Sequence, residues 1–190
     1  MYQSKQSLVD RIVNNLTIDY SIKNKKNSGE IGNFLEKFFI DNIHKKNSSD
    51  IPNLELKTKN IQASSKYISL ATYTNPKNAL ERTYEKIKNH IGYIEYEYLN
   101  RKIYIRRFTI FKKCDIKEFR KAVNIRGGKE FSLNISANYL PIVFKSYDKV
   151  VAWQRIKNMI AWEKGWQKLK NNLEKMNRQY RFTINFIWYI

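Results

Sequence analysis

The sequence contains a single cysteine, Cys114, among its 190 residues. One cysteine excludes an internal disulfide framework and any zinc site built from several cysteines, so we expect Cys114 to be a small packed side chain. The two histidines, His44 and His90, lie far apart, and neither has a partner at the spacing of metal ligands. We therefore interpret both histidines as surface or structural residues.

Long apolar stretches are also missing. No uninterrupted run approaches the roughly 20 apolar residues that a membrane-spanning helix needs. The N-terminal residues, Met-Tyr-Gln-Ser-Lys-Gln-Ser, lack the apolar core of a signal peptide. We expect a soluble, cytoplasmic protein without a membrane partner.

Acidic residues are scarce. The 17 Asp and Glu stand against 36 Lys and Arg, which gives a formal net charge of +19. A field of this sign attracts polyanions, nucleic acid first and an anionic membrane surface second. The composition bias of an AT-rich genome explains much of the lysine excess but not the shortage of acids, so the charge favours a nucleic-acid partner.

The chain has the length of one domain and is large enough for a core without disulfides or a structural metal. No linker, internal repeat or low-complexity tract divides it. We therefore expect a single domain over residues 1–190.

Helical spacing of apolar residues predicts helices at 5–17, 29–44, 77–90, 115–123 and 147–177. A basic loop at 24–29 precedes the second helix. That helix has the clearest stripe, because its apolar residues fall at i, i+3, i+4, i+7 and i+8: Ile31, Phe34, Leu35, Phe38 and Phe39.

Alternating or β-branched and aromatic runs predict strands at 53–58, 66–74, 93–99, 102–111, 130–135 and 181–190. The runs at 93–99 and 102–111 meet at Asn100-Arg101 and predict a long β-hairpin. Helices and strands together indicate a mixed α/β fold.

Residues 50–58, DIPNLELKT, carry the side chains that a metal-dependent phosphodiesterase needs. If 53–58 is a strand, its period of two puts Glu55 and Lys57 on one face and two leucines on the other. Asp50 lies just upstream, across the bend imposed by Pro52, so both carboxylates can converge on Mg²⁺, which prefers oxygen ligands. The ammonium of Lys57 would then lie beside the metal, where a water or a phosphate oxygen is held.

A simpler interpretation of these residues stays open. In it, a half-buried strand exposes Glu55, Lys57 and Lys59 to solvent and binds no metal. Glu36 has two interpretations as well. It falls outside the apolar stripe of its helix, with Gly32 one turn before it, so a backbone or a phosphate could approach closely there; the alternative is a solvated glutamate paired with a nearby lysine.

Three features follow one another in a recognisable order: the helix with Gly32-Asn33-Phe34-Leu35-Glu36, then Asp50, and then the strand with Leu54-Glu55-Leu56-Lys57-Thr58. This order resembles the MutH mismatch-repair nickase and its restriction-enzyme relatives of the MvaI and BcnI type. Those proteins carry a Gly-x-x-x-Glu helix, an Asp and a Glu-x-Lys strand that is usually followed by Thr. The resemblance covers roughly residues 28–75, and the present chain is shorter than those relatives.

The resemblance implies the PD-(D/E)XK nuclease fold, a mixed β-sheet flanked by helices that clamps double-stranded DNA. It implies that Asp50 and Glu55 bind Mg²⁺, with Mn²⁺ as a substitute, that Lys57 is the catalytic lysine and that Glu36 supports the site. The short gap from Asp50 to Glu55 resembles the MvaI type and favours a restriction enzyme over a repair nickase. Such an enzyme would act in a bacterial cell as a monomer or homodimer, beside a companion DNA methyltransferase of the same specificity.

Basic residues on the predicted hairpin and on the loop after it are candidates for contacts with DNA phosphates or with guanines. Arg106 and Arg126 are candidates for reading bases, and the alternative is a strand face whose charges keep the sheet soluble. Lys86-Ile87-Lys88 is faintly similar to a basic helical segment of the family. The predicted DNA contacts are therefore Lys86, Lys88, Arg101, Arg106, Arg107, Arg126 and Lys129.

The sequence thus predicts a Mg²⁺-dependent, sequence-specific DNA endonuclease of the type II restriction kind. Its catalytic core would span about residues 28–110 and its DNA-recognition elements about 100–145. Two alternatives stay open: a basic nucleic-acid-binding module without catalysis, and a repair nickase similar to MutH.

Overall fold

The fold is taken from a computed structural model that describes residues 5–25, 27, 29–40, 53–127 and 129–151, and the backbone of residues 183 and 184. Asp50 and His44 lie outside these residues, as do most of the helix expected at 147–177 and most of the strand expected at 181–190. Within the described part, no helix is long and apolar enough to cross a membrane.

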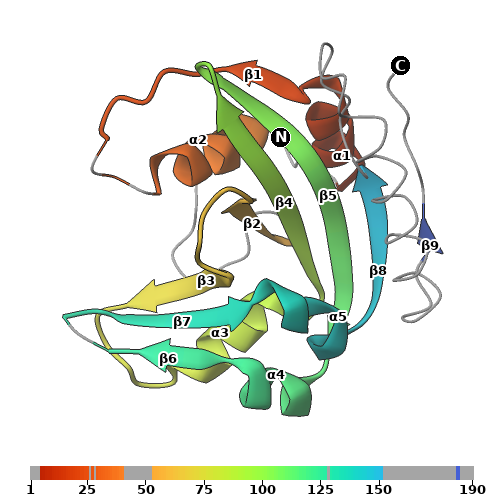
Figure 1. The fold of residues 1–190 in the computed structure, drawn as a ribbon. Coiled ribbons are helices and arrows are strands. Elements are labelled where there is room, and N and C mark those ends of the chain that lie inside the picture. Colours follow the sequence, from red (N-terminus) through yellow and green to blue (C-terminus); the bar gives the residue numbers. More distant parts are fainter. Residues whose placement is uncertain are drawn as a thin grey trace.

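A mixed β-sheet forms the centre of the fold (Figure 1). Its strands follow the order β2, β4, β5, β8 and β9, and β1 pairs with β5 outside this path. β2 runs parallel to β4 and β8 runs parallel to β9, whereas the other pairs are antiparallel. The strands are β1 (Thr17–Asp19), β2 (Glu55–Asn60), β4 (His90–Leu99), β5 (Lys102–Cys114), β8 (Phe144–Val151) and β9 (Thr183–Ile184).

A second, antiparallel sheet has the strand order β3, β7, β6. These strands are β3 (Tyr67–Tyr73), β6 (Asn124–Arg126) and β7 (Phe131–Ser136). The helices are α1 (Lys5–Asn14), α2 (Glu30–Phe39), α3 (Ala79–Ile87), α4 (Ile116–Ala122), the 3₁₀ helix η1 (Ala137–Tyr139) and α5 (Leu140–Val143). The mixed α/β class predicted from the sequence is confirmed.

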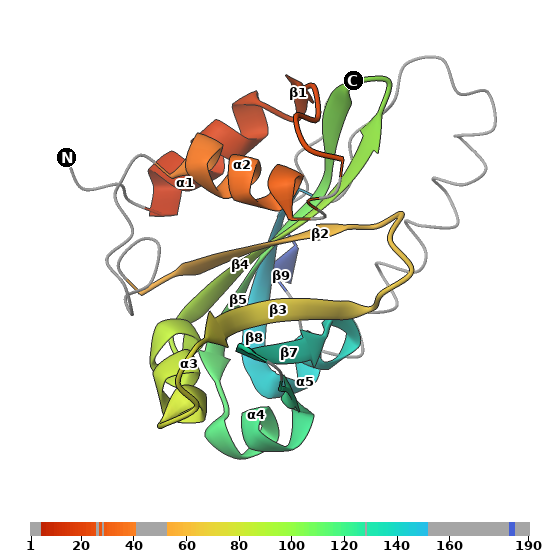
Figure 2. The ribbon, with the colours of Figure 1, turned by 90° about the vertical axis from the view of Figure 1, so that its left-hand side faces the viewer.

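The two faces of the larger sheet carry different cores. Leu54 and Leu56 at β2 pack with α1, α2 and the apolar side chains of β4 and β5 on one face. Ile91 and Phe111 pack on the other face with β3, β7 and helices α3, α4 and α5. Figure 2 shows β2 between these two layers, with α1 and α2 on one side and β3 on the other.

The long hairpin predicted from the sequence is formed by β4 and β5. The turn residues Asn100 and Arg101 have φ values of 50° and 58°, so both adopt the left-handed conformation of a tight two-residue hairpin turn. The hairpin extends beyond its predicted ends, because β4 begins at His90 and β5 continues to Cys114.

Helix α2 is shorter than the predicted helix at 29–44. It ends at Phe39, because Ile40 turns into an extended conformation with φ −110°, and residues 41–44 lie outside the described part. Its stripe is partly confirmed: Ile31, Leu35 and Phe39 are buried, but Phe38 is 38% exposed.

The sequence interpretation was wrong at residues 147–151, which form part of strand β8 rather than the start of a helix. The burial of β8 alternates, with Tyr147, Lys149 and Val151 buried, and Tyr147 and Lys149 pair with Phe111 and Thr109 of β5. Pairing with a long neighbouring strand outweighs the helical spacing of the apolar residues. The first helix also ends earlier than predicted, at Asn14, because Thr17–Asp19 pairs with β5 as strand β1.

Gly32 allows α2 to lie close to β2. A Cβ atom at Gly32 would come within 2.7 Å of Thr58 Oγ1. Replacing an interior helix glycine by alanine normally stabilises a protein by about 1 kcal/mol. At Gly32 the contact opposes that gain.

We predict that Gly32→Ala lowers the free energy of unfolding by about 1 to 3 kcal/mol, because the two elements must move apart. The double variant Gly32→Ala/Thr58→Ala should recover much of the loss, because it removes the oxygen that the new methyl group meets. Chemical denaturation measures both values. Asn33→Ala, at an exposed position of the same helix, is the control and should not destabilise; a stabilising Gly32→Ala would contradict the close approach.

Candidate active site

Strand β2 holds two of the predicted catalytic residues on one face. Glu55 and Lys57 form an ion pair with 2.9 Å between Lys57 Nζ and Glu55 Oε1. The side chain of Glu55 is 4% exposed and that of Lys57 is 15% exposed. Leu54 and Leu56 point into the core on the opposite face, so the predicted alternation of β2 is confirmed.

The second carboxylate oxygen of Glu55, Oε2, is buried and has no hydrogen-bond partner among the described residues. A buried carboxylate oxygen without a partner is costly, and a divalent cation would satisfy it. The residues present therefore fit a metal at Glu55. No group of three or more His, Cys, Asp or Glu residues that could hold a metal occurs in the part of the chain that the structure describes, so the second ligand depends on Asp50, which remains a prediction.

Glu36 lies one turn after Gly32 on α2 and is half-buried. Helix α2 packs against the face of β2 that carries Leu54 and Leu56, opposite to the face of Glu55 and Lys57. The supporting role of Glu36 remains a prediction.

Neighbouring strands continue the polar face of Lys57 across the larger sheet. Lys57 pairs with Tyr93 on β4, Tyr93 pairs with Thr109 on β5, and Thr109 pairs with Lys149 on β8. We call this row of four paired residues, Lys57, Tyr93, Thr109 and Lys149, the lysine row. The next row contains Lys59, Glu95 and Arg107.

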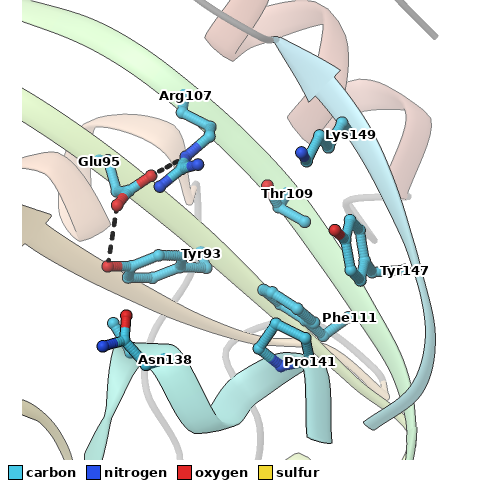
Figure 3. A pocket seen from close by; sticks show the side chains of 10 residues that line it. Tyr93, Glu95, Arg107, Thr109, Phe111, Asn138, Pro141, Tyr147 and Lys149 are labelled. Carbon is cyan, nitrogen blue, oxygen red and sulfur yellow. Dashed lines mark hydrogen bonds and ion pairs between the residues drawn. The ribbon is translucent and has the colours of Figure 1, made fainter. Parts of the chain in front are cut away.

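A cavity of about 300 Å³ opens on this face (Figure 3). Arg107 forms an ion pair with Glu95, and Tyr93 donates its hydroxyl to Glu95 Oε1 at 3.3 Å. The cavity is lined by β4, β5 and β8 and by the η1 and α5 segment: Tyr93, Glu95, Arg107, Thr109, Phe111, Ala137, Asn138, Pro141, Tyr147 and Lys149. We call it the sheet pocket.

Burial changes the proton affinities in the sheet pocket. Lys149 is 2% exposed, and burial together with the nearby charge of Arg107 lowers its pKa to about 8. Burial and the Glu95 carboxylate raise the pKa of Tyr93 above its usual range. Lys149 is therefore a largely protonated ammonium at neutral pH in a dry environment.

Four residues of the sheet pocket were not predicted as site residues from the sequence: Tyr93, Glu95, Thr109 and Lys149. The signal for the first two was the alternation of Tyr93, Glu95 and Glu97 along β4, which places them on one face. The position of Lys149 on this face was not predicted, because its segment was interpreted as a helix.

Five of the seven predicted DNA contacts are exposed or half-buried and lie outside the sheet pocket. Arg101, Arg126 and Lys129 are exposed, and the guanidinium of Arg126 lies 5.2 Å from the centre of the Tyr67 ring. Lys86 and Lys88 on and after α3 are half-buried, and Lys88 pairs with Glu85 at 2.6 Å. These five residues remain candidates for DNA contacts.

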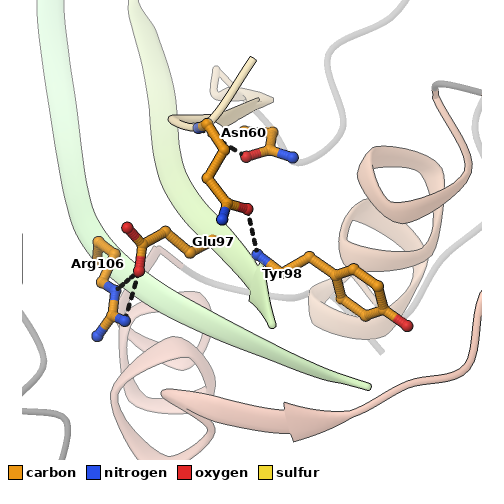
Figure 4. Close-up of polar contacts among 5 residues, drawn as sticks. Asn60, Glu97, Tyr98 and Arg106 are labelled. Atoms are coloured by element: carbon orange, nitrogen blue, oxygen red, sulfur yellow. Dashed lines mark hydrogen bonds and ion pairs between the residues drawn. The ribbon is translucent and has the colours of Figure 1, made fainter. Parts of the chain in front are cut away.

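Arg106 and Arg107 are held by carboxylates of β4 instead. The side chain of Arg106 is 2% exposed, and its Nε and Nη2 donate to Glu97 Oε2 at 2.8 and 2.5 Å (Figure 4). This burial argues against the predicted base-reading role of Arg106. Arg107 pairs with Glu95 inside the sheet pocket, so it does not belong to an exposed hairpin surface either.

Polar contacts also fix the far end of β2 to β4. The amide of Gln62 donates to Asn60 Oδ1 at 2.9 Å, and the Gln62 side chain accepts from the Tyr98 amide at 3.2 Å (Figure 4). Ile61 N donates to the Tyr96 carbonyl at 2.9 Å. These bonds hold the register that places Lys57 beside Tyr93.

The structural interpretation of His90 and Cys114 agrees with their environments. A ring nitrogen of His90 lies 3.0 Å from the carbonyl of Asn53, just before β2, and burial lowers the pKa of His90. Cys114 is buried, and burial raises the pKa of its thiol to about 12. Such a thiol is an inert packed side chain at neutral pH.

We predict that Arg106→Met lowers the free energy of unfolding by about 1 to 3 kcal/mol, because the carboxylate of Glu97 loses its partner. Its DNA affinity and the salt dependence of that affinity should stay unchanged. Lys129→Met, which removes an exposed charge, should do the reverse and leave stability within about 0.5 kcal/mol. Denaturation and fluorescence anisotropy with labelled duplex measure the two effects; a loss of DNA affinity in Arg106→Met at unchanged stability would restore its predicted role.

No protein-family model matches the chain, and no curated protein sequence matches it. Among solved structures, the fold is similar to that of a complex described as restriction endonuclease MvaI with cognate DNA substrate. The match has a TM-score of 0.55 and 13% sequence identity, and it covers 78% of this chain and 99% of that chain. The chain therefore has a restriction-endonuclease-like fold.

Proposed function

We propose that the protein is a Mg²⁺-dependent, sequence-specific endonuclease that hydrolyses phosphodiester bonds in double-stranded DNA, as type II restriction enzymes do. One observation carries the proposal: the buried Glu55 and the half-buried Lys57 form an ion pair on one face of β2, and Glu55 Oε2 lacks a protein partner among the described residues. The restriction-endonuclease-like fold supports it.

Glu55 and Asp50 would hold the metal. When bound, Mg²⁺ would neutralise charge on the phosphate and lower the pKa of a coordinated water. Lys57 Nζ, 2.9 Å from Glu55 Oε1, would lie beside the reacting phosphate and either orient the attacking water or stabilise the negative charge on the phosphate oxygens around the pentavalent phosphorus. Glu36 would support the site from α2.

DNA is the proposed substrate because of the net charge of +19 and the DNA substrate present in the similar MvaI complex. Exposed cations such as Arg101, Arg126 and Lys129 would contact phosphates. A restriction role would also require a companion methyltransferase that protects the host sites. We therefore propose DNA and a companion methyltransferase as the partners of this protein.

We predict that Glu55→Gln and Lys57→Met each reduce the cleavage rate of plasmid DNA by about a thousandfold or more, because several kcal/mol of transition-state stabilisation are lost. Both variants should still bind DNA. Lys59→Met is the matched control, two residues further on the same face of β2, and should retain cleavage within about tenfold. Gel analysis of plasmid and mapping of fragment ends measure cutting, and a wild-type protein that binds but never cuts would favour a binding module.

Metal binding can be tested without activity. Mg²⁺ or Mn²⁺ should raise the melting temperature of the wild-type protein. A metal concentration of 100 times the Kd should increase the free energy of unfolding by about 2.7 kcal/mol. The shift should vanish in Glu55→Gln and in Asp50→Asn, because each removes a proposed ligand charge. Equal shifts in all three proteins would place the metal elsewhere.

A further inference from the structure

The sheet pocket has a cationic end. Arg107 and Lys149 line it with two positive charges against the single carboxylate of Glu95, so its lining carries an excess of one positive charge. Thr109, 3% exposed, pairs with Lys149 across the strands, and its hydroxyl-bearing side chain lines the same pocket. This combination suits a phosphate group, which accepts charge-assisted hydrogen bonds.

The same pocket has an aromatic and apolar side. Phe111 lies at the centre of a ring cluster, with its centroid 4.8 Å from that of Tyr147 and 6.5 Å from that of Tyr93. Pro141 faces this cluster from α5, and the amide side chain of the exposed residue Asn138 lies at the η1 side (Figure 3). Apolar walls with a few amide or carboxylate groups are suited to a planar base.

Size restricts the ligand further. A cavity of about 300 Å³ lies at the lower end of the range for small-molecule sites, so it can take one nucleotide but no duplex. Lys149 and Lys57 lie at the two ends of the lysine row, and their backbones are three strand spacings, or about 14 Å, apart. A strand of a few nucleotides is long enough to extend from one end of this row to the other.

We propose that the sheet pocket binds a single nucleotide, with its phosphate at Lys149, Arg107 and Thr109 and its base against Phe111 and Pro141. The nucleotide is either one unit of DNA turned out of the helix or a free mononucleotide. The DNA source rests on the proposed function, but the affinity of the pocket for a nucleotide does not.

The first experiment measures binding to the whole protein by isothermal titration calorimetry. Three ligands are titrated separately: a deoxynucleoside 5′-monophosphate, the matching nucleoside and inorganic phosphate. We expect saturable binding of the mononucleotide that is tighter than that of either fragment. Lys149→Met should weaken it by about ten- to a hundredfold, because a hydrogen bond to a charged group is lost. Thr109→Val should weaken it less.

The choice of variants distinguishes a loss of nucleotide binding from a folding defect. Lys149→Met keeps a side chain of similar length, so the fold should be retained. Lys145→Met is the matched control, because Lys145 is exposed on the same strand and does not line the pocket. If the mononucleotide does not saturate the protein, or if Lys149→Met and Lys145→Met bind it equally, the proposal is overturned.

Mononucleotide affinity should also fall as the pH rises from 7 to 9, because Lys149 loses its proton near pH 8. The charged and titratable groups that face it are Arg107, Glu95, Tyr93 and Tyr147, and the η1 and α5 residues of the pocket carry no charge. Lys149→Met should abolish this dependence. A wild-type affinity that is constant over this range would contradict the phosphate contact at Lys149.

A second experiment distinguishes the two sources of the nucleotide. It compares the affinity of the protein for a fully paired duplex and for the same duplex with one unpaired nucleotide, measured without divalent cations so that no cleavage occurs. Turning a paired base out costs a few kcal/mol, so the wild-type protein should prefer the duplex with the unpaired nucleotide, and Lys149→Met should lose the preference. Equal affinities together with mononucleotide binding assign the pocket to a free nucleotide. Glu55→Gln should bind the mononucleotide normally, so a failure of cleavage leaves this result intact.

Discussion

The register between β2 and β4 determines how β2 packs in the sheet and which face carries Glu55 and Lys57. Leu54 and Leu56 anchor β2 in the core beneath α2, and the period of two then turns Glu55 and Lys57 to the opposite face. A slip by one residue would bury the ion pair in the apolar core. The close approach of Gly32 to Thr58 and the bonds from Gln62 and Ile61 to β4 both oppose such a slip. Packing and the candidate chemistry are thus fixed by the same pairing.

The polar face of the sheet is poorly explained by stability alone. Ion pairs such as Glu95 with Arg107, and the buried ammonium of Lys149, cost desolvation energy that apolar residues of similar size would avoid. The apolar clusters on both faces of the same strands show that this chain can build apolar cores. Departures from apolar packing that gather in one place are typical of functional sites. The concentration of such groups on the face of Lys57 therefore supports a ligand-binding role for that whole face.

Local patterns predicted much of the fold. The alternation at β2, the turn at Asn100 and Arg101 and the stripe of α2 depend on neighbours in sequence, and each is confirmed in outline. The burial of Arg106 could not be predicted, because the pairing of β4 and β5 shifts between Glu95 and Tyr96 and changes the alternation of β5 at this residue. Strand β8 was missed because its partner residues in β5 lie at least 30 positions earlier in the sequence. The sheet pocket needs both of these long-range pairings, so no local pattern indicates it.

Affinity and chemistry would be carried by different parts of the protein. The net charge of +19 and exposed residues such as Arg126 and Lys129 act through solvent, where salt screens them and sequence matters little. Lys57 and Lys149 lie in drier surroundings, where one charge has a larger effect on a bound phosphate. The exposed cations can therefore hold a duplex without selecting a bond. In the proposed function, selection of the bond would fall to the lysine row, whose strand pairing fixes the spacing of the backbones that carry Lys57 and Lys149.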